Sequence, residues 1–243
     1  MLVPSSNTTM ETELPQLMRR RATTHPSETF TFHSARMRMR TVNQDELELM
    51  NRSTERAAHE IADVRPNVVA TACLVAIMAQ GPGFHRAAEA SIGSVLDIEE
   101  AAAPVVSSAG SLVVALRAVG ATRVALITPY VKPLTSRVVD YLEAEGIAVH
   151  DALSLEVQDN HAVAALDQRN LLEHAKRLSV TGCDALVVSA CVQMPSLDVI
   201  DAVEEQAGVP VLSAATATAW AILRALELDA AIPGAGSLLR PVA

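Results

Sequence analysis

Two cysteines end two similar segments of this chain, and this match constrains the fold more than any other feature. Cys73 follows an apolar run of strand character at residues 68–72, and Cys191 follows another at residues 186–190. Each run ends in a small residue before the thiol, and the chain contains only three cysteines. The pattern predicts an internal duplication that places two thiols at equivalent points of two similar halves, facing one another across a cleft.

Two further pairs of segments support the duplication. Residues 104–109 return as residues 210–215, and residues 2–5 return more loosely as residues 126–129. The three pairs keep their order along the chain, and their spacing is far longer than the period of about 20–50 residues that is typical of solenoid repeats. Chance similarity of apolar strands explains any one pair, but three pairs in one order favour duplicated half-domains.

Strand and helix signals alternate along the chain, which indicates a parallel sheet built from βαβ units. The expected strands lie near residues 2–3, 29–33, 67–72, 104–106, 123–128, 148–155, 185–190 and 209–212. The expected helices cover residues 8–21, 44–64, 110–119, 133–145, 167–179, 197–207 and 215–226. We expect one half-domain to contain residues 1–110 plus 213–243 and the other residues 111–212, with the last helix crossing back to the first half.

Composition sets the broad class of the protein. The 243 residues are 50% hydrophobic but only 2% aromatic, so the core is expected to consist of small aliphatic side chains. A net charge of −9 without a basic aromatic patch argues against binding to nucleic acid. An odd number of cysteines without extracellular signals indicates reduced thiols and a cytoplasmic protein. The longest nearly apolar stretch, residues 68–79, is too short for a membrane span, so no membrane partner is expected.

Polar and thiol groups follow several expected strands, at the strand ends where open α/β sheets bind ligands. The polar turn at residues 3–11 includes Asn7, which can cap the following helix, and its free backbone N–H groups can bind a carboxylate. A thiol beside the first N–H groups of a helix is expected to have a lowered pKa. The alternative for a single cysteine is a small buried hydrophobic residue, and we assign this role to Cys183.

Metal and nucleotide sites are not expected. The seven histidines are scattered, with no cysteine or histidine at zinc spacing. The glycines of Gly81-Pro82-Gly83 lack the spacing of a dinucleotide or phosphate loop. They open an additional segment, residues 80–93, for which we favour a lid over a merely longer connection.

The opening residues 4–11 and the residues 189–196 around the second cysteine, together with Ala72-Cys73 and Thr128-Pro129-Tyr130, resemble the maleate cis–trans isomerases of the Asp/Glu/hydantoin racemase superfamily. The resemblance covers essentially the whole chain. It implies two pseudo-symmetric flavodoxin-like halves, each a parallel sheet flanked by helices, with the site in the cleft between them. It also implies a small dicarboxylate substrate, no cofactor and no metal, and we expect a homodimer.

The resemblance also implies a role for particular residues. Cys73 would be the nucleophile and Cys191 the proton donor, while the carboxylates of the substrate would be bound by Asn7, Tyr130 and Asn160. Backbone groups of the two cysteine turns would add further donors, at Leu74, Val75 and Val192. Tyr130 has a plainer alternative, as an ordinary packing residue between the halves.

Paired thiols suit an addition–elimination reaction. A thiolate that adds to one carbon of maleate turns the double bond into a single bond, so rotation and expulsion of the thiol give fumarate, while the second thiol handles a proton. The main alternative is an amino-acid or hydantoin racemase that uses the two thiols as opposed acid and base. An arylmalonate decarboxylase needs only one cysteine, and a non-catalytic dicarboxylate-binding domain gains nothing from two.

Overall fold

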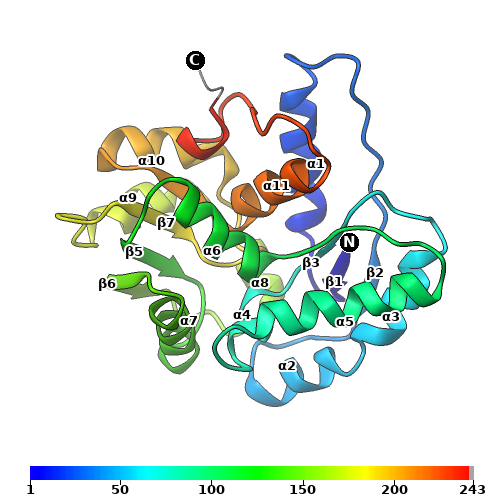
Figure 1. Ribbon diagram of the computed structural model, residues 1–243. Helices are drawn as coiled ribbons and strands as arrows, with labels where there is room; N and C mark the ends of the chain where they lie inside the picture. The colour runs from blue at the N-terminus through cyan, green and yellow to red at the C-terminus, as the bar shows by residue number, and fades with distance from the viewer. Residues whose placement is uncertain (241–243) are drawn as a thin grey trace.

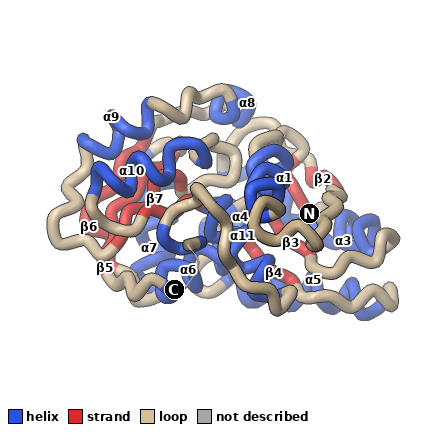
Figure 2. The backbone as a smooth tube through the Cα atoms, turned by 90° about the horizontal axis from the view of Figure 1, so that it is seen from above, coloured by secondary structure: helices blue, strands red, loops and turns tan. Residues whose placement is uncertain are grey.

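The computed structural model describes residues 1–240, and within them the chain forms two four-stranded parallel sheets. The first sheet has the order β2-β1-β3-β4, and its strands are Ala35–Met37, Leu2–Pro4, Val69–Thr71 and Val105–Ser107. The second has the order β6-β5-β7-β8, and its strands are Ala148–Ser154, Arg123–Thr128, Ala185–Ser189 and Val211–Ser213. Figure 2 shows the two sheets side by side, each surrounded by helices. The expected α/β architecture of two similar halves is confirmed.

Helices flank both sheets (Figure 1). They are α1 Met10–Arg21, α2 Gln44–Asn51, α3 Thr54–Ala62, α4 Leu74–Met78, α5 Phe84–Ile98, α6 Ser108–Ala118, α7 Lys132–Ala144, α8 Asn160–Ala164, α9 Asn170–Lys176, α10 Ile200–Ala207 and α11 Ala214–Ala225. Two short 3-10 turns cover Leu197–Val199 and Ser237–Leu239. No helix within residues 1–240 combines the length and apolar character needed to cross a bilayer.

The segments that repeat in the sequence occupy equivalent places in the two sheets. β1 and β5 are each second in their sheet, β3 and β7 each precede one of the paired cysteines, and β4 and β8 are each at an edge. The last pair also matches in detail, because the side chains of Ser107 and Ser213 cap α6 and α11 by accepting from Gly110 and Thr216, at 3.0 and 3.1 Å. α6 and α11 pack against each other. The division into residues 1–110 plus 213–243 and residues 111–212 stays a prediction.

Three expectations about the first half are wrong. The strand expected at residues 29–33 lies at Ala35–Met37, because Leu2 at the start of β1 pairs with Ala35. The single helix expected at residues 44–64 is broken between α2 and α3. The segment at residues 80–93 is not the lid that we expected, since most of it belongs to α5, which begins at Phe84 and packs on α3 and β4. Its buried side chains Ile92, Val95 and Leu96 follow the spacing of one helical face.

Candidate active site

Both thiols line one small cavity between the two sheets. Cys73 follows β3 and precedes the first residue of α4, while Cys191 lies in the turn after β7, so each thiol is at the carboxyl end of an equivalent strand. All the residues that the sequence suggested for the site line this cavity, namely Asn7, Cys73, Leu74, Val75, Tyr130, Asn160, Cys191 and Val192. Sequence reasoning missed five others, Pro4, Met39, Val42, Ala72 and Gln193.

A backbone contact between the halves closes the cavity. Thr41, in the segment between β2 and α2, forms an antiparallel bridge with Asp159, and the N–H of Val42 donates to the carbonyl of Gln158 at 3.3 Å. Met39 and Val42 line the cavity from this segment. The space inside the cavity is about 10 Å³, which holds roughly one water molecule. A four-carbon dicarboxylate is larger than this space, so the cavity must widen before it can enter.

Burial dominates the chemistry of Cys73. It raises the pKa of the thiol to about 12, although the backbone N–H of Ala76 favours the thiolate and opposes this shift. The neighbouring Cys191 raises the pKa further. The expectation of a lowered pKa is wrong for this closed state, because desolvation of the charged form outweighs the N–H groups at the start of α4.

Burial also raises the pKa of Cys191, and several donors oppose this effect. The Tyr130 hydroxyl and the backbone N–H groups of Gln193 and Met194 favour the thiolate and lower the pKa. The N–H of Gln193 donates to the sulfur at 3.4 Å. The Glu13 carboxylate raises the pKa by its charge. Both thiols are therefore neutral in the closed site, and a thiolate forms more readily while the site is open to water.

Tyr130 is a buried hydrogen-bond donor beside both sulfurs. Burial raises the pKa of its phenol well above the usual value, and the two thiols raise it further. The side chain therefore stays neutral near pH 7 and keeps its proton for a sulfur or a carboxylate. The phenol lies beside both thiols, and its role in binding a substrate carboxylate stays a prediction.

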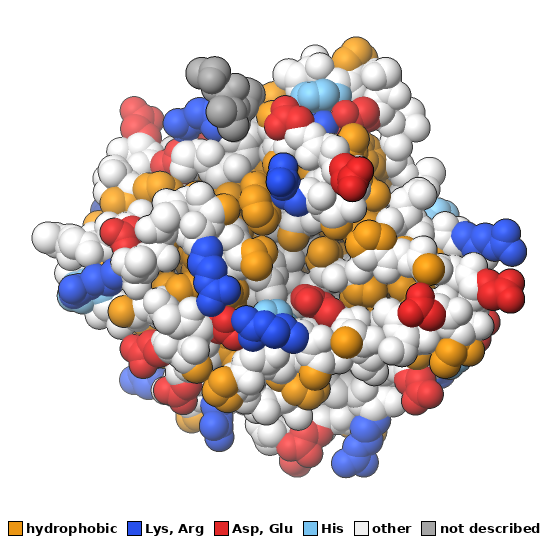
Figure 3. Space-filling view, in the orientation of Figure 1, with side chains coloured by type: hydrophobic (Ala, Val, Ile, Leu, Met, Phe, Trp, Pro, Cys, Tyr) orange, Lys and Arg blue, Asp and Glu red, His pale blue; other side chains and the backbone are white. Residues whose placement is uncertain are grey.

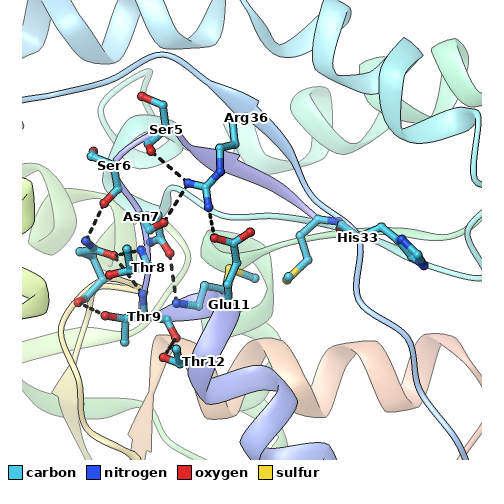
Figure 4. A network of polar contacts seen from close by, with 12 residues as sticks. Ser5, Ser6, Asn7, Thr8, Thr9, Glu11, Thr12, His33 and Arg36 are labelled. Atoms are coloured by element: carbon cyan, nitrogen blue, oxygen red, sulfur yellow. Dashed lines mark hydrogen bonds and ion pairs between the residues drawn. The ribbon is translucent and has the colours of Figure 1, made fainter.

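Asn7 connects the start of α1 with the turn of Cys191. Its Oδ1 accepts from the N–H of Met10 at 3.0 Å, which caps α1, and its Nδ2 donates to the carbonyl of Val192 at 3.4 Å. Arg36 points toward the opening turn that contains Asn7, and it donates to the carbonyls of Ser5 and Asn7, as Figure 4 shows. An amide nitrogen carries two hydrogens, so one Nδ2 hydrogen of Asn7 has no partner within residues 1–240.

Asn160 contacts the opening turn from the other half. It is the first residue of α8, and its Nδ2 donates to the Ser6 hydroxyl at 2.8 Å. Its backbone carbonyl accepts from Nε2 of Gln193 at 3.0 Å. The two amide side chains thus lie on opposite sides of the boundary between the halves, both beside the cavity.

Glu13 is a buried carboxyl group behind the cavity that sequence reasoning did not identify. From α1 it accepts the backbone N–H groups of Ser196 and Leu197 at 2.6 and 2.8 Å, which joins the first half to the segment after Cys191. Burial raises its pKa to about 7, and the two backbone hydrogen bonds oppose the shift.

The donors at the cavity are neutral groups. In the described part of the chain, no lysine or arginine lines the cavity. On the face seen in Figure 3, apolar side chains gather near the middle, and side chains of both charges are scattered around them. Among residues 1–240, no three His, Cys, Asp or Glu side chains are grouped so that they could hold a metal ion. A dianion would therefore be bound by hydrogen bonds rather than by ion pairs.

Known proteins resemble this chain over nearly its whole length. Residues 7–239 match the family model described as arylmalonate decarboxylase. The maleate isomerase of Geobacillus stearothermophilus is 53% identical over 239 residues, which cover 98% of this chain and 95% of the relative.

Two solved structures have nearly the same fold. A cysteine-to-alanine variant of the maleate isomerase of Pseudomonas putida S16, solved with maleate, is 50% identical with a TM-score of 0.97, covering 98% of this chain and 95% of that one. A mutant of the Nocardia farcinica maleate cis–trans isomerase, which holds a covalently bound succinylcysteine intermediate, is 50% identical with a TM-score of 0.96, covering 100% and 97%.

Proposed function

The chain belongs to the maleate isomerase family, and on that premise we propose that it converts maleate to fumarate through a covalent cysteine adduct. The observation that carries the proposal is the pair of buried thiols at one closed cavity, at the carboxyl ends of equivalent strands. The relative from Nocardia farcinica, which is half identical to this chain, is known with a succinylcysteine intermediate. That adduct is the species expected when a cysteine adds to maleate.

The proposed reaction begins at Cys73. Its thiolate forms a bond to one alkene carbon, and the electron pair of the double bond moves toward the carboxylate on the neighbouring carbon. The thiol of Cys191 supplies a proton to that neighbouring carbon, which completes the succinyl thioether. Rotation about the new single bond places the carboxylates trans. Cys191 then recovers the proton, the carbon–sulfur bond breaks, and fumarate leaves with Cys73 again a thiolate.

Neutral donors stabilise the charge that develops in this reaction. We assign the carboxylates of the substrate to Asn7, Tyr130 and Asn160, and to the backbone N–H groups of Leu74, Val75 and Val192. The first-turn N–H groups of a helix have no partner within the helix, so those of α4 are available to a ligand. Donors fixed in a water-excluded cavity are worth more to a developing negative charge than the same donors in water. Side chains and backbone alone suffice for this proposal, without metal or cofactor.

Incubation of the purified protein with maleate tests the function. Proton nuclear magnetic resonance should show the maleate signal replaced by that of fumarate, without an added cofactor. Cys183→Ser serves as the matched control, because this thiol is also buried but does not line the cavity. No fumarate, together with exchange of the α-proton of an amino acid in deuterated water, would favour the racemase alternative.

The same proposal includes a cytoplasmic protein that acts as a homodimer. All three cysteines are free, which fits a reducing compartment. Light scattering coupled to size-exclusion chromatography tests the dimer, and a mass near the 25.7 kDa of one chain would contradict it.

A further inference from the structure

Gln193 has a buried side-chain amide in which every hydrogen-bonding position is occupied. Its Oε1 accepts the backbone N–H groups of Thr8 and Thr9 at 2.9 and 3.3 Å. Its Nε2 donates to the carbonyls of Ser6 and Asn160 at 2.9 and 3.0 Å. Because a primary amide offers two donors and two acceptor sites, this side chain is fully satisfied, and its orientation is determined by its partners.

The partners of Gln193 belong to three separate parts of the cavity wall. Ser6, Thr8 and Thr9 surround Asn7 in the opening turn of the first half. Asn160 begins α8 in the second half. The main chain of Gln193 itself belongs to the Cys191 turn, where its N–H donates to Sγ of Cys191 at 3.4 Å and its carbonyl accepts from the Thr9 hydroxyl at 2.7 Å.

We propose that Gln193 is a positioning residue that sets the relative places of Cys191, Asn7 and Asn160 across the boundary between the halves. The proposal rests on the function proposed above and adds a residue that need not touch the substrate. Three groups that must meet one small substrate come from segments far apart in the sequence, and Gln193 connects all three. Its side-chain amide bonds to the opening turn and to Asn160, and its backbone N–H donates to Sγ of Cys191. A misplacement of about 1 Å can lower a rate about 100-fold, so the amide matters for turnover as well as for stability.

An isosteric substitution separates the positioning role of the amide group from the effect of side-chain size. In Gln193→Glu, one carboxyl oxygen can still accept from Thr8 and Thr9, but the other oxygen replaces Nε2 and faces the carbonyls of Ser6 and Asn160. Ionised, this oxygen is repelled by both carbonyls; protonated, it donates to one of them and restores part of the network. Burial beside two carbonyl oxygens raises the pKa of the introduced carboxyl above its usual value of about 4.3.

The experiment compares kcat/KM for maleate in the variant and the wild type between about pH 5 and 9, a range that includes a raised carboxyl pKa. The ratio of variant to wild type removes the pH dependence of the thiols themselves. We expect the ratio to be within about tenfold of unity at the acidic end and to fall to about one hundredth at the alkaline end. Gln193→Met, which is similar in size but has no amide, should be low throughout with a flat ratio.

Gln206→Glu is the matched control. Gln206 is exposed on α10, and its amide also donates to a backbone carbonyl, that of Leu172 at 3.0 Å. Its ratio should stay near unity at every pH. Three results would overturn the proposal. They are a pH-independent ratio for Gln193→Glu, near-normal activity of Gln193→Met, and a fall in the Gln193→Glu ratio that occurs only where circular dichroism shows unfolding.

A readout without turnover separates this proposal from the proposed function. Alkylation of Cys191 by iodoacetamide, followed by peptide mass spectrometry, should accelerate in Gln193→Glu relative to the wild type as pH rises, because the turn is released. If the wild type makes no fumarate but this difference is present, the function fails and the positioning role stands. If fumarate forms, but the ratios of variant to wild type for kcat/KM and for the alkylation rate are both independent of pH, the positioning role fails.

Discussion

Replacement of Glu13 by glutamine should change how the stability of the protein depends on pH. The carboxyl group is buried, and its pKa in the folded protein is about 7 against an ordinary value of 4.5. A group whose pKa is raised on folding binds more protons in the folded state. Its contribution to stability is fully present below about pH 4.5 and is lost as pH rises through about 7. One pH unit of difference corresponds to about 1.4 kcal/mol, so the loss amounts to about 3 kcal/mol.

Glu13→Gln keeps the shape of the side chain and an oxygen that can accept from Ser196 and Leu197, but it does not titrate. We therefore expect the free energy of unfolding of the wild type to fall by about 3 kcal/mol relative to the variant between about pH 4.5 and 8. Urea denaturation at several pH values, followed by circular dichroism, measures this difference. Other titrating groups cancel in the comparison, because they are the same in both proteins.

Glu205→Gln is the control, since Glu205 is exposed on α10 and the substitution removes the same charge. Its difference from the wild type should stay nearly constant over the same range. If the difference between the wild type and Glu13→Gln is also constant with pH, Glu13 is not a buried group with a raised pKa, and the reasoning is refuted.

Three further predictions concern the thiols, the pH dependence of activity and the packing of α6. Cys73→Ser should be nearly inactive. When Cys191→Ser is given maleate, mass spectrometry should show that a succinyl group accumulates on Cys73. An adduct found only on Cys191, in the Cys73→Ser variant, would reverse the roles of the two thiols. Activity should rise with pH through one apparent pKa and fall through another, and both values belong to the coupled thiols. A chelator should leave this pH profile unchanged. A loss of activity in the chelator that added metal restores would contradict this prediction. Gly110→Ala should lower the free energy of unfolding by about 1–3 kcal/mol in a urea titration, because its Cβ would lie 2.6 Å from Oε1 of Glu89 and 2.8 Å from Cδ2 of His85; an unchanged midpoint would refute the clash.

The sequence by itself determined the duplication and the location of the site. Strand character, followed by a small residue and a thiol, is a local pattern, and parallel strands bring their carboxyl ends to one edge of a sheet. Each thiol therefore lies at the carboxyl edge of its own sheet, and the duplication predicted that these two edges face each other. Both thiols line one cavity there, together with Asn7 and Tyr130. The resemblance added the choice of Asn160, which has no local motif of its own.

Only the tertiary structure decided which residues support the site from the other half. Gln193 contacts Thr8 and Glu13 contacts Ser196 across more than 180 residues of sequence, and no local pattern reports such a contact. The shifted strand β2 has the same cause, because its position depends on its register with β1. The pKa of Cys73 also depends on the closed fold. A helix N-terminus can be read from sequence and favours a thiolate, but the desolvation that outweighs it exists only when both halves and their cover exclude water.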